Sequence, residues 1–190
     1  LYARWPLLEI EAPLPVPPHY ESLIPRAGGG FTFADTQNNR VVTFSADGRL
    51  IDAWGSRGHR EAQFRQLDRL VKARGSLLAL DRTPAGDEGR TLLKQFDLEG
   101  NYIGLWHGSL AVDAAGPDGV LYDAVGLRVD RYSPEGRLVG SFPVHPGTDG
   151  EAHSAKALAI APDGTLAVAT GTGIRRHDTW NSSTMHWMAQ

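Results

Sequence analysis

An aromatic residue followed ten positions later by a second aromatic residue occurs three times in this 190-residue chain, each time with an acidic residue and a glycine between them. The aromatic pairs are Phe44 and Trp54, Phe96 and Trp106, and Tyr132 and Phe142. The dipeptides between them are Asp47-Gly48, Glu99-Gly100 and Glu135-Gly136. An acidic-Gly dipeptide between two apolar runs is typical of a β-hairpin, and a hairpin repeated in one register constrains the whole architecture.

Short apolar segments precede each hairpin and complete a larger repeat. The clearest of these predicted strands cover 31–35, 77–81, 120–123 and 166–170. Additional short strands are predicted before three of them, at 70–71, 110–112 and 158–160. Four strands in about 45 residues is the period of a propeller blade, and a blade buries its faces only by stacking on neighbours.

The sequence therefore predicts an all-β fold, a β-propeller or partial propeller of about four four-stranded blades. We place the blades at 23–66, 67–108, 109–152 and 153–190, within one domain that covers 23–190. Residues 1–22 are predicted to form an extended arm, because their prolines can neither donate to a ladder nor continue a helix. A short helix is expected around 61–72, and the Gly-, Pro- and acid-rich segment 83–89 is expected to be an exposed loop.

One stretch of the first repeat resembles a known family. It runs Asp-Thr-Gln-Asn-Asn-Arg-Val-Val-Thr-Phe over residues 35–44, and Asp47-Gly48 and Trp54-Gly55 follow. This run resembles an NHL repeat, whose blades carry an Asp-x-x-Asn-x-Arg-Val core, an aromatic residue, an Asp-Gly turn and a closing Phe-Gly or Trp-Gly. The resemblance covers about residues 23–178 and implies NHL-like blades. Propellers of that family usually have more than four blades, so we expect uncovered sheet faces that another chain can meet.

Two acid–arginine pairs are predicted to brace hairpins. Asp35 and Arg40 stand five residues apart, and Asp123 and Arg128 repeat that spacing in the third repeat. The resemblance places each pair on two strands joined by a tight turn, where a carboxylate accepts guanidinium hydrogen bonds. The second repeat keeps Asp81 but has Leu92 in the arginine register.

A central metal site is the alternative explanation for these recurring acids. Asp35, Asp81 and Asp123 recur at matching places of the repeat, and some NHL-like enzymes hold zinc through histidines at the centre of the ring. The seven histidines form no His-x-His or His-x-x-x-His pair, and there is no cysteine to supply a thiolate ligand. We expect no catalytic residue, no cofactor and no metal, and we keep a lyase-like or hydrolase-like propeller enzyme with a central metal as the alternative function.

Basic residues gather between the first two repeats, although the net charge of the chain is −3. Arg57, Arg60 and Arg65 begin a cluster that continues to Arg74. Such a cluster suits an acidic protein surface, anionic lipid headgroups or RNA. These three arginines are candidate partner-binding residues, and a solvated loop is the alternative interpretation of the cluster. An RNA-binding propeller is kept as a second alternative function, with nucleic acid the less favoured partner.

Aromatic residues near both ends are further candidate partner-binding residues. Tyr2, Arg4 and Trp5 have the mixture typical of juxtamembrane segments. Trp180 and Trp187 lie in a segment that either supplies the last strand of the fourth repeat or packs into a partner. No run of about 18 apolar residues is present in the chain as given.

These features together favour a non-catalytic protein-binding or scaffold module. We expect an accessory or membrane-extrinsic subunit, held by its arm and blade faces against other protein chains of a larger assembly, with a membrane protein complex as one such assembly. The expected location is extracytoplasmic or peripheral to a membrane, and an anchor or leader before Leu1 is one explanation for the first residues.

Overall fold

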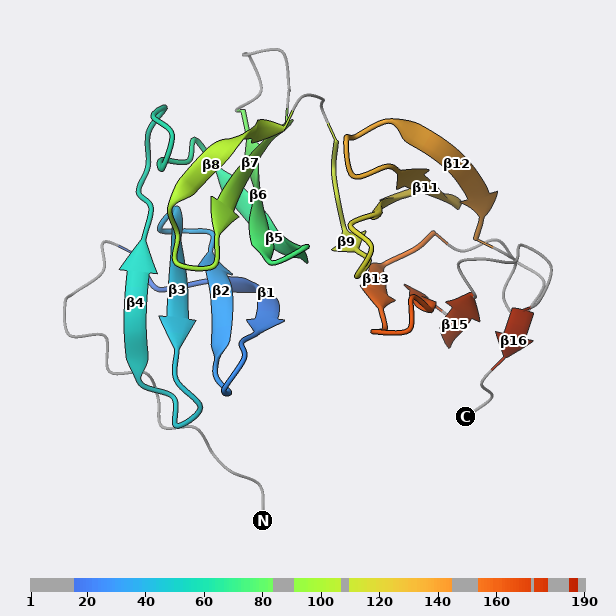
Figure 1. The fold of residues 1–190 in the computed structure, drawn as a ribbon, viewed down its shortest axis with the longest axis horizontal. Coiled ribbons are helices and arrows are strands. Elements are labelled where there is room, and N and C mark those ends of the chain that lie inside the picture. Colours follow the sequence, from blue (N-terminus) through green and yellow to red (C-terminus); the bar gives the residue numbers. More distant parts are fainter. Residues whose placement is uncertain are drawn as a thin grey trace. The chain divides into compact units, whose positions relative to one another are not determined.

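A computed structural model describes residues 16–83, 91–106, 110–144, 154–171, 173–177 and 185–187, the side chains of 175–177 and 185–187 excepted. The described residues form sixteen strands and no helix (Figure 1). They make four antiparallel sheets of four strands each, and the strands of every sheet follow one another in chain order. The predicted all-β fold of four four-stranded repeats is confirmed. In this part of the chain there is accordingly no helix that could cross a membrane.

Each sheet contains one copy of the repeat. The first sheet has β1 (Tyr20–Pro25), β2 (Phe31–Asp35), β3 (Arg40–Phe44) and β4 (Leu50–Trp54). The second has β5 (Leu67–Ala73), β6 (Ser76–Arg82), β7 (Thr91–Asp97) and β8 (Tyr102–Trp106). The third has β9 (Ala114–Ala115), β10 (Leu121–Val125), β11 (Arg128–Tyr132) and β12 (Leu138–Pro143). The fourth has β13 (Ala157–Ile160), β14 (Leu166–Thr170), β15 (Gly173–His177) and β16 (Met185–Trp187).

The first strands of the sheets differ most from the sequence predictions. β1 begins at Tyr20, inside the segment predicted to be an arm, and residues 1–15 lie outside the described residues. The helix predicted around 61–72 is wrong, because a loop up to residue 66 leads into β5. β5 has buried residues on both faces, and this produces a helix-like spacing of apolar residues in a strand. The strand predicted at 110–112 is also wrong: β9 lies at Ala114–Ala115.

The repeated aromatic pairs mark the hairpins β3–β4, β7–β8 and β11–β12. In each hairpin a β-bulge lies next to the residue pair nearest the turn. These pairs are Phe44 with Leu50, Phe96 with Tyr102, and Tyr132 with Leu138. The extra residue on the outer strand is Ile51, Ile103 or Val139, and these side chains are 56–62% exposed. The bulge therefore turns a branched apolar side chain outward at the same place in three sheets.

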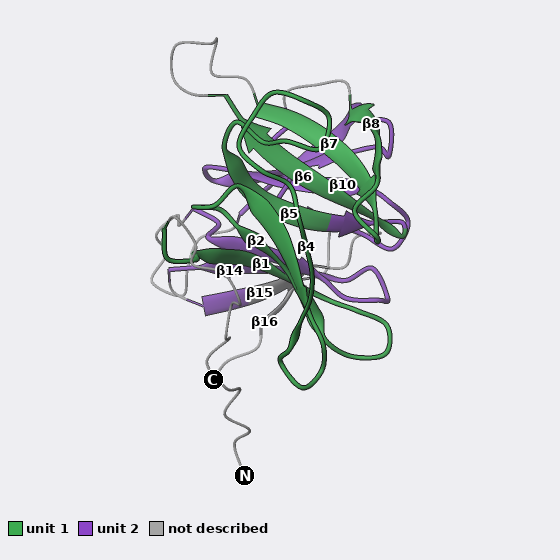
Figure 2. Cartoon of the chain, turned by 90° about the vertical axis from the view of Figure 1, so that its left-hand side faces the viewer, with its two compact units in different colours: residues 1–71, 75–109 green, residues 72–74, 110–190 purple. Residues whose placement is uncertain are grey.

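The chain divides into two compact units, residues 1–71 with 75–109 and residues 72–74 with 110–190 (Figure 2). In unit 1 the first sheet contributes Ile24, Ala34 and Val41 to a core with Phe64, Leu67, Leu70, Leu77, Ala79 and Phe96. In unit 2 the third sheet contributes Val120, Tyr122 and Val129 to a core with Leu166 and Val168 of the fourth sheet. Each core thus joins a sheet to the next sheet along the chain, as stacked blades require.

Polar contacts also join the first two sheets within unit 1. The side-chain oxygen of Asn39 accepts a hydrogen bond from the Leu67 amide (2.9 Å), and Ser22 Oγ accepts one from the Leu70 amide (3.0 Å). Arg26 donates to the Leu98 carbonyl at 3.0 Å. These contacts give backbone groups of β5 and of the β7–β8 turn a side-chain partner from the first sheet.

Candidate functional site

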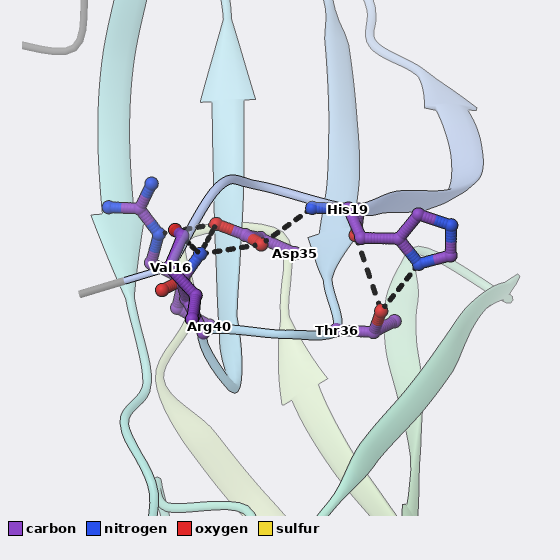
Figure 3. A network of polar contacts seen from close by, with 6 residues as sticks. Val16, His19, Asp35, Thr36 and Arg40 are labelled. Atoms are coloured by element: carbon purple, nitrogen blue, oxygen red, sulfur yellow. Dashed lines mark hydrogen bonds and ion pairs between the residues drawn. The ribbon is translucent and has the colours of Figure 1, made fainter. Parts of the chain in front are cut away.

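The carboxylate of Asp35 is the centre of a polar network at the end of β2 (Figure 3). The residue is fully buried, and its oxygens accept hydrogen bonds from Arg40 Nε at 2.9 Å and from Asn38 Nδ2 at 3.0 Å. The backbone amide of His19 donates a third at 3.2 Å. The predicted pairing of Asp35 with Arg40 is therefore present, and the carboxylate connects the segment before β1 to the β2–β3 hairpin.

The segment before β1 is held by further contacts of this network. The amide of Thr36 donates to the His19 carbonyl at 2.9 Å, and Thr36 Oγ1 lies 3.2 Å from His19 Nδ1. Asn38 Nδ2 also donates to the carbonyl of Val16 at 3.1 Å (Figure 3). Burial raises the pKa of the neighbouring Tyr20 hydroxyl, and the Asp35 carboxylate raises it further while Arg40 opposes the shift.

In the second sheet, Asp81 connects the segment before the first strand to the sheet, as Asp35 does in the first sheet, but its positively charged partner is a lysine. Its carboxylate accepts the backbone amides of Arg65 (2.8 Å) and Gln66 (3.0 Å), which directly precede β5. Leu92 stands opposite Asp81, and the positive charge comes from Lys94, whose Nζ lies 3.0 Å from Asp81 Oδ2. Sequence reasoning missed Lys94. The signal was a single lysine inside the apolar strand β7, two residues from the arginine register.

The third hairpin departs from the predicted bracing. Arg128 forms a bidentate pair with Asp130, at 2.9 and 3.1 Å, and Asp123 stands opposite Asp130. Arg128 thus pairs along its own strand with Asp130, and Asp123, which the prediction paired with it, also stabilises the Arg128 charge electrostatically. The cause is the length of the turn, which is four residues in the first hairpin (36–39) and two in the third (126–127). The strands of the third hairpin extend further and carry Arg128 past Asp123.

The ion pair in the third sheet changes the titration of both of its members. The hydrogen bonds from Arg128 hold the pKa of Asp130 below its ordinary value, and a hydrogen bond from the Ser141 hydroxyl adds to this effect. The same pairing raises the pKa of Arg128. Asp130 is buried while Arg128 is more than half exposed, so the pair has one solvated end.

The recurring acids consequently do not occupy matching places in three sheets. Asp35 and Asp81 share a register, and in the third sheet that register holds Val125. The carboxylates of Asp35 and Asp81 each accept several hydrogen bonds from their own sheet or from the segments directly next to it. Within the described ranges, no group of three or more His, Asp or Glu residues could hold a metal ion.

The loop between β4 and β5, residues 55–66, carries the predicted partner-binding arginines, and we name it the basic loop. Arg57 and Arg60 are exposed and Arg65 is half-buried. Backbone hydrogen bonds run from the Phe64 amide to the Ser56 carbonyl (2.8 Å) and from the Gly58 amide to the Phe64 carbonyl (2.9 Å). The Gln63 side chain accepts from the Arg60 amide and donates to Ser56 Oγ, both at 3.3 Å. The loop therefore has its own hydrogen-bonded structure.

A buried anchor fixes the basic loop to the second sheet. The ring of Phe64 is fully buried, with ring centroids 6.1 Å from Trp54 and 5.8 Å from Phe96. Lys94 Nζ lies 5.5 Å from the centre of the Phe64 ring and donates to the carbonyls of Arg60 and Gln63. The lysine that neutralises Asp81 also holds the loop, so the arginines are displayed from a fixed backbone.

The described side chains include none of the other predicted binding residues. Tyr2, Arg4, Trp5 and Trp180 lie outside the described residues, and of Trp187 only the backbone, in β16, is described. The basic cluster also offers fewer unneutralised charges than its sequence suggests. Arg69 and Arg82 both form ion pairs with Asp68, at 2.9 and 3.1 Å.

Comparison with known proteins identifies the fold. No protein-family model matches the chain, and no curated protein matches it. Among solved structures, virginiamycin B lyase from Staphylococcus aureus superposes with a TM-score of 0.55 at 12% identity. The match covers 91% of this chain and 56% of the lyase. The chain has a β-propeller fold.

Two further solved structures agree with this conclusion. A luciferin-regenerating enzyme gives a TM-score of 0.57 at 17% identity, covering 90% of this chain and 62% of that one. A gluconolactonase from Xanthomonas campestris gives 0.54 at 14% identity, covering 82% and 55%. At these identities the likeness shows the fold alone. The propeller chain spans between 55% and 62% of the length of the three structures that it resembles.

Proposed function

We propose that this propeller is a non-catalytic module that binds another protein, and that the basic loop recognises an acidic surface of that partner. The observation that carries the proposal is the display of Arg57 and Arg60 on a loop fixed by Phe64 and Lys94. Among the described residues, neither guanidinium is paired with a carboxylate.

Two physical arguments support this interpretation. A loop that is already ordered loses little conformational entropy when it binds, so more of the interaction energy remains for affinity. Arginine is enriched at protein interfaces, because its guanidinium forms bidentate hydrogen bonds with carboxylates and stacks on flat surfaces. The recurring acids Asp35 and Asp81 form ion pairs within their own sheets, which fits a structural role for these two residues.

We also propose that the repeats are of the NHL type, on the strength of the Asp35–Phe44 run, and that the chain is an accessory subunit of a larger assembly. The binding proposal is tested by expressing the tagged chain in the cells that it comes from and identifying the proteins that co-purify with it. We compare the wild-type chain with the double variant Arg57→Glu/Arg60→Glu. The control is Arg49→Glu, since Arg49 is an exposed arginine in the β3–β4 turn.

The expected result is a set of proteins that is retained by the wild-type chain and by Arg49→Glu and is lost from the double variant. Equal recovery from all three chains contradicts a role for the basic loop. Nuclease treatment separates the RNA alternative, because a partner set that disappears with nuclease is held through nucleic acid.

The enzyme alternative takes its support from the names of similar structures, a lyase and a lactonase, which describe those proteins. Metal analysis of the purified chain separates it from the binding proposal. A metal ion bound tightly in a one-to-one ratio favours the enzyme alternative. If removing that metal leaves the recovery of partner proteins unchanged, the result favours the binding module.

A further inference from the structure

Three sheets share one exposed cross-strand position, and the second sheet fills it differently. The position lies on the outermost strand, opposite the residue that is two before the repeated aromatic residue of the neighbouring strand. It is held by Ala53 in the first sheet, by Leu105 in the second and by Ser141 in the third. All three residues are exposed, Leu105 by 43%. The repeat thus has a small side chain here in the first and third sheets and a large apolar one in the second.

The packing of the sheets does not explain this leucine. An alanine and a serine hold the same position in sheets of the same strand order, so the fold does not require a large side chain there. A side chain that is nearly half exposed also gains only part of the free energy that full burial would give it. A departure from the repeat that the fold does not require points to a functional contact.

Leu105 lies beside the basic loop. It stands directly opposite Lys94, and directly opposed residues project from the same face of a sheet. The ammonium of Lys94 donates to the carbonyl of Arg60 at 3.2 Å and to the carbonyl of Gln63. Leu105 is therefore a neighbour of the lysine that holds the basic loop in place, and all of these residues belong to unit 1.

Exposed positive charge and exposed apolar area thus meet at one margin of the second sheet. We name Arg57, Arg60 and Leu105 the mixed surface. The backbone beneath it is fixed, since Phe64 anchors the loop and the pairing of β7 with β8 holds Leu105. A ligand that contacts both parts therefore loses little binding energy to the ordering of this surface.

We propose that the partner of the basic loop is a short segment of another protein that carries acidic residues next to an apolar side chain. The acidic residues pair with Arg57 and Arg60, and the apolar side chain packs on Leu105. The inference rests on the proposed function, which supplies the acidic partner, and adds the apolar contact to it. Charge complementarity fixes the orientation and speeds association, while the apolar contact removes Leu105 from water.

The composition of the mixed surface favours a protein segment over RNA or a lipid membrane. Glu61 is exposed directly after Arg60, and its charge opposes a phosphate-rich surface. Proteins that read single-stranded RNA stack its bases on aromatic rings or guanidinium planes, and a leucine offers no such plane. Anionic membranes attract clusters of about four to eight basic residues, whereas the basic loop contains three arginines and one glutamate.

The proposal is tested by selecting a random peptide library, displayed on phage, against the purified wild-type chain. The expected result is enrichment of peptides that combine aspartate or glutamate with a nearby apolar residue. Selection against Arg57→Glu/Arg60→Glu should lose the acidic residues. Selection against Leu105→Ala should keep the acidic residues and lose the apolar one, so each variant removes one half of the recognised pattern.

The affinity of the best selected peptide is then measured by fluorescence anisotropy. Leu105→Ala and Leu105→Ser introduce the residues of the first and third sheets, and both should weaken binding about tenfold or more, because the apolar contact is lost. Rising salt should weaken the wild-type and Leu105→Ala complexes by the same factor, because both chains keep their arginines. The control is Leu138→Ala, at a 59% exposed leucine of β12 in unit 2, which should bind as the wild type does. Circular dichroism establishes that each variant is folded.

The proposal is overturned by a selection that yields no peptide with both acidic and apolar residues, or by Leu105 variants that bind the selected peptide as tightly as the wild type. Acidic peptides without an apolar preference, bound equally by Leu105→Ala, would leave the proposed function standing and remove this inference alone. Selected peptides without acidic residues would contradict both. Binding to phosphatidylserine vesicles that the same substitutions weaken, in place of such peptides, would assign the mixed surface to a membrane and also overturn the proposal.

Discussion

The ammonium of Lys94 lies 3.0 Å from a carboxylate oxygen of Asp81, and the two side chains are only 6% and 1% exposed. Replacing Lys94 by methionine leaves the Asp81 charge buried without its cation and frees the basic loop. We expect the free energy of unfolding to fall by about 3–5 kcal/mol, measured by urea denaturation. Lys72→Met, at an exposed position of β5, should change it by less than about 0.5 kcal/mol. Equal effects of the two substitutions would show that the buried pair is not what stabilises this sheet.

Phe64 is expected to be the residue that orders the basic loop. Phe64→Ala removes a fully buried ring between Trp54 and Phe96 and should cost about 3–5 kcal/mol of stability. Trypsin cleavage after Arg57 and Arg60 should become faster under native conditions, because the loop loses its anchor. Leu127→Ala removes an exposed side chain in the third hairpin and should change neither stability nor cleavage. Unchanged cleavage in Phe64→Ala would contradict the anchoring role.

The ion pair between Arg128 and Asp130 should make stability depend on pH. The folded-state pKa of Asp130 is lowered, so its stabilising contribution is complete above the ordinary value of 3.8 and is lost as the pH falls through the depressed folded value. Arg128→Gln should raise the pKa of Asp130 in a carboxyl-carbon NMR titration. The stability difference between wild type and Arg128→Gln should shrink as Asp130 becomes protonated. If the titration midpoint of Asp130 is the same in Arg128→Gln and in the wild type, Arg128 is not the cause of the lowered pKa.

Two glycines of the turn before β2 offer a matched pair of substitutions. Gly28 and Gly30 both have a positive φ, of 84° and 83°, but only a Cβ at Gly30 would overlap the carbonyl oxygen of Phe44. Gly28→Ala should cost about 1–2 kcal/mol from backbone strain alone. Gly30→Ala should cost clearly more, because the strands β2 and β3 must separate locally. Thermal unfolding of the two variants measures the difference, and equal costs would contradict the steric argument.

The repeated hairpins were predictable because their determinants are local. The spacing from Phe44 to Trp54 and the Asp47-Gly48 turn fix two strands and the turn between them, and Gly48 has the positive φ that such a turn needs. Asp35 and Arg40 were predictable for the same reason, since they face each other across one turn. The four-sheet architecture followed from repetition of these local signals.

The errors arose where contacts are not local or where turn lengths differ. Asp123 and Arg128 keep the spacing of the first pair, but a turn shorter by two residues shifts them out of register. Lys94 and Phe64 come together only in the folded second sheet, and each looks unremarkable in its own segment. β5 was mistaken for a helix because burial on both faces removes the alternation that marks a strand.

The bulges at Ile51, Ile103 and Val139 have a consequence for how these sheets can grow. Each one interrupts regular pairing near the start of an outermost strand, and a bulged edge is a poor template for adding a foreign strand. Aliphatic side chains on β4, β8 and β12 are thus exposed without offering a straight ladder of amides and carbonyls. These bulged outermost strands should disfavour amyloid-like stacking. Other protein chains would therefore contact the sheets through side chains and loops and not through added strands.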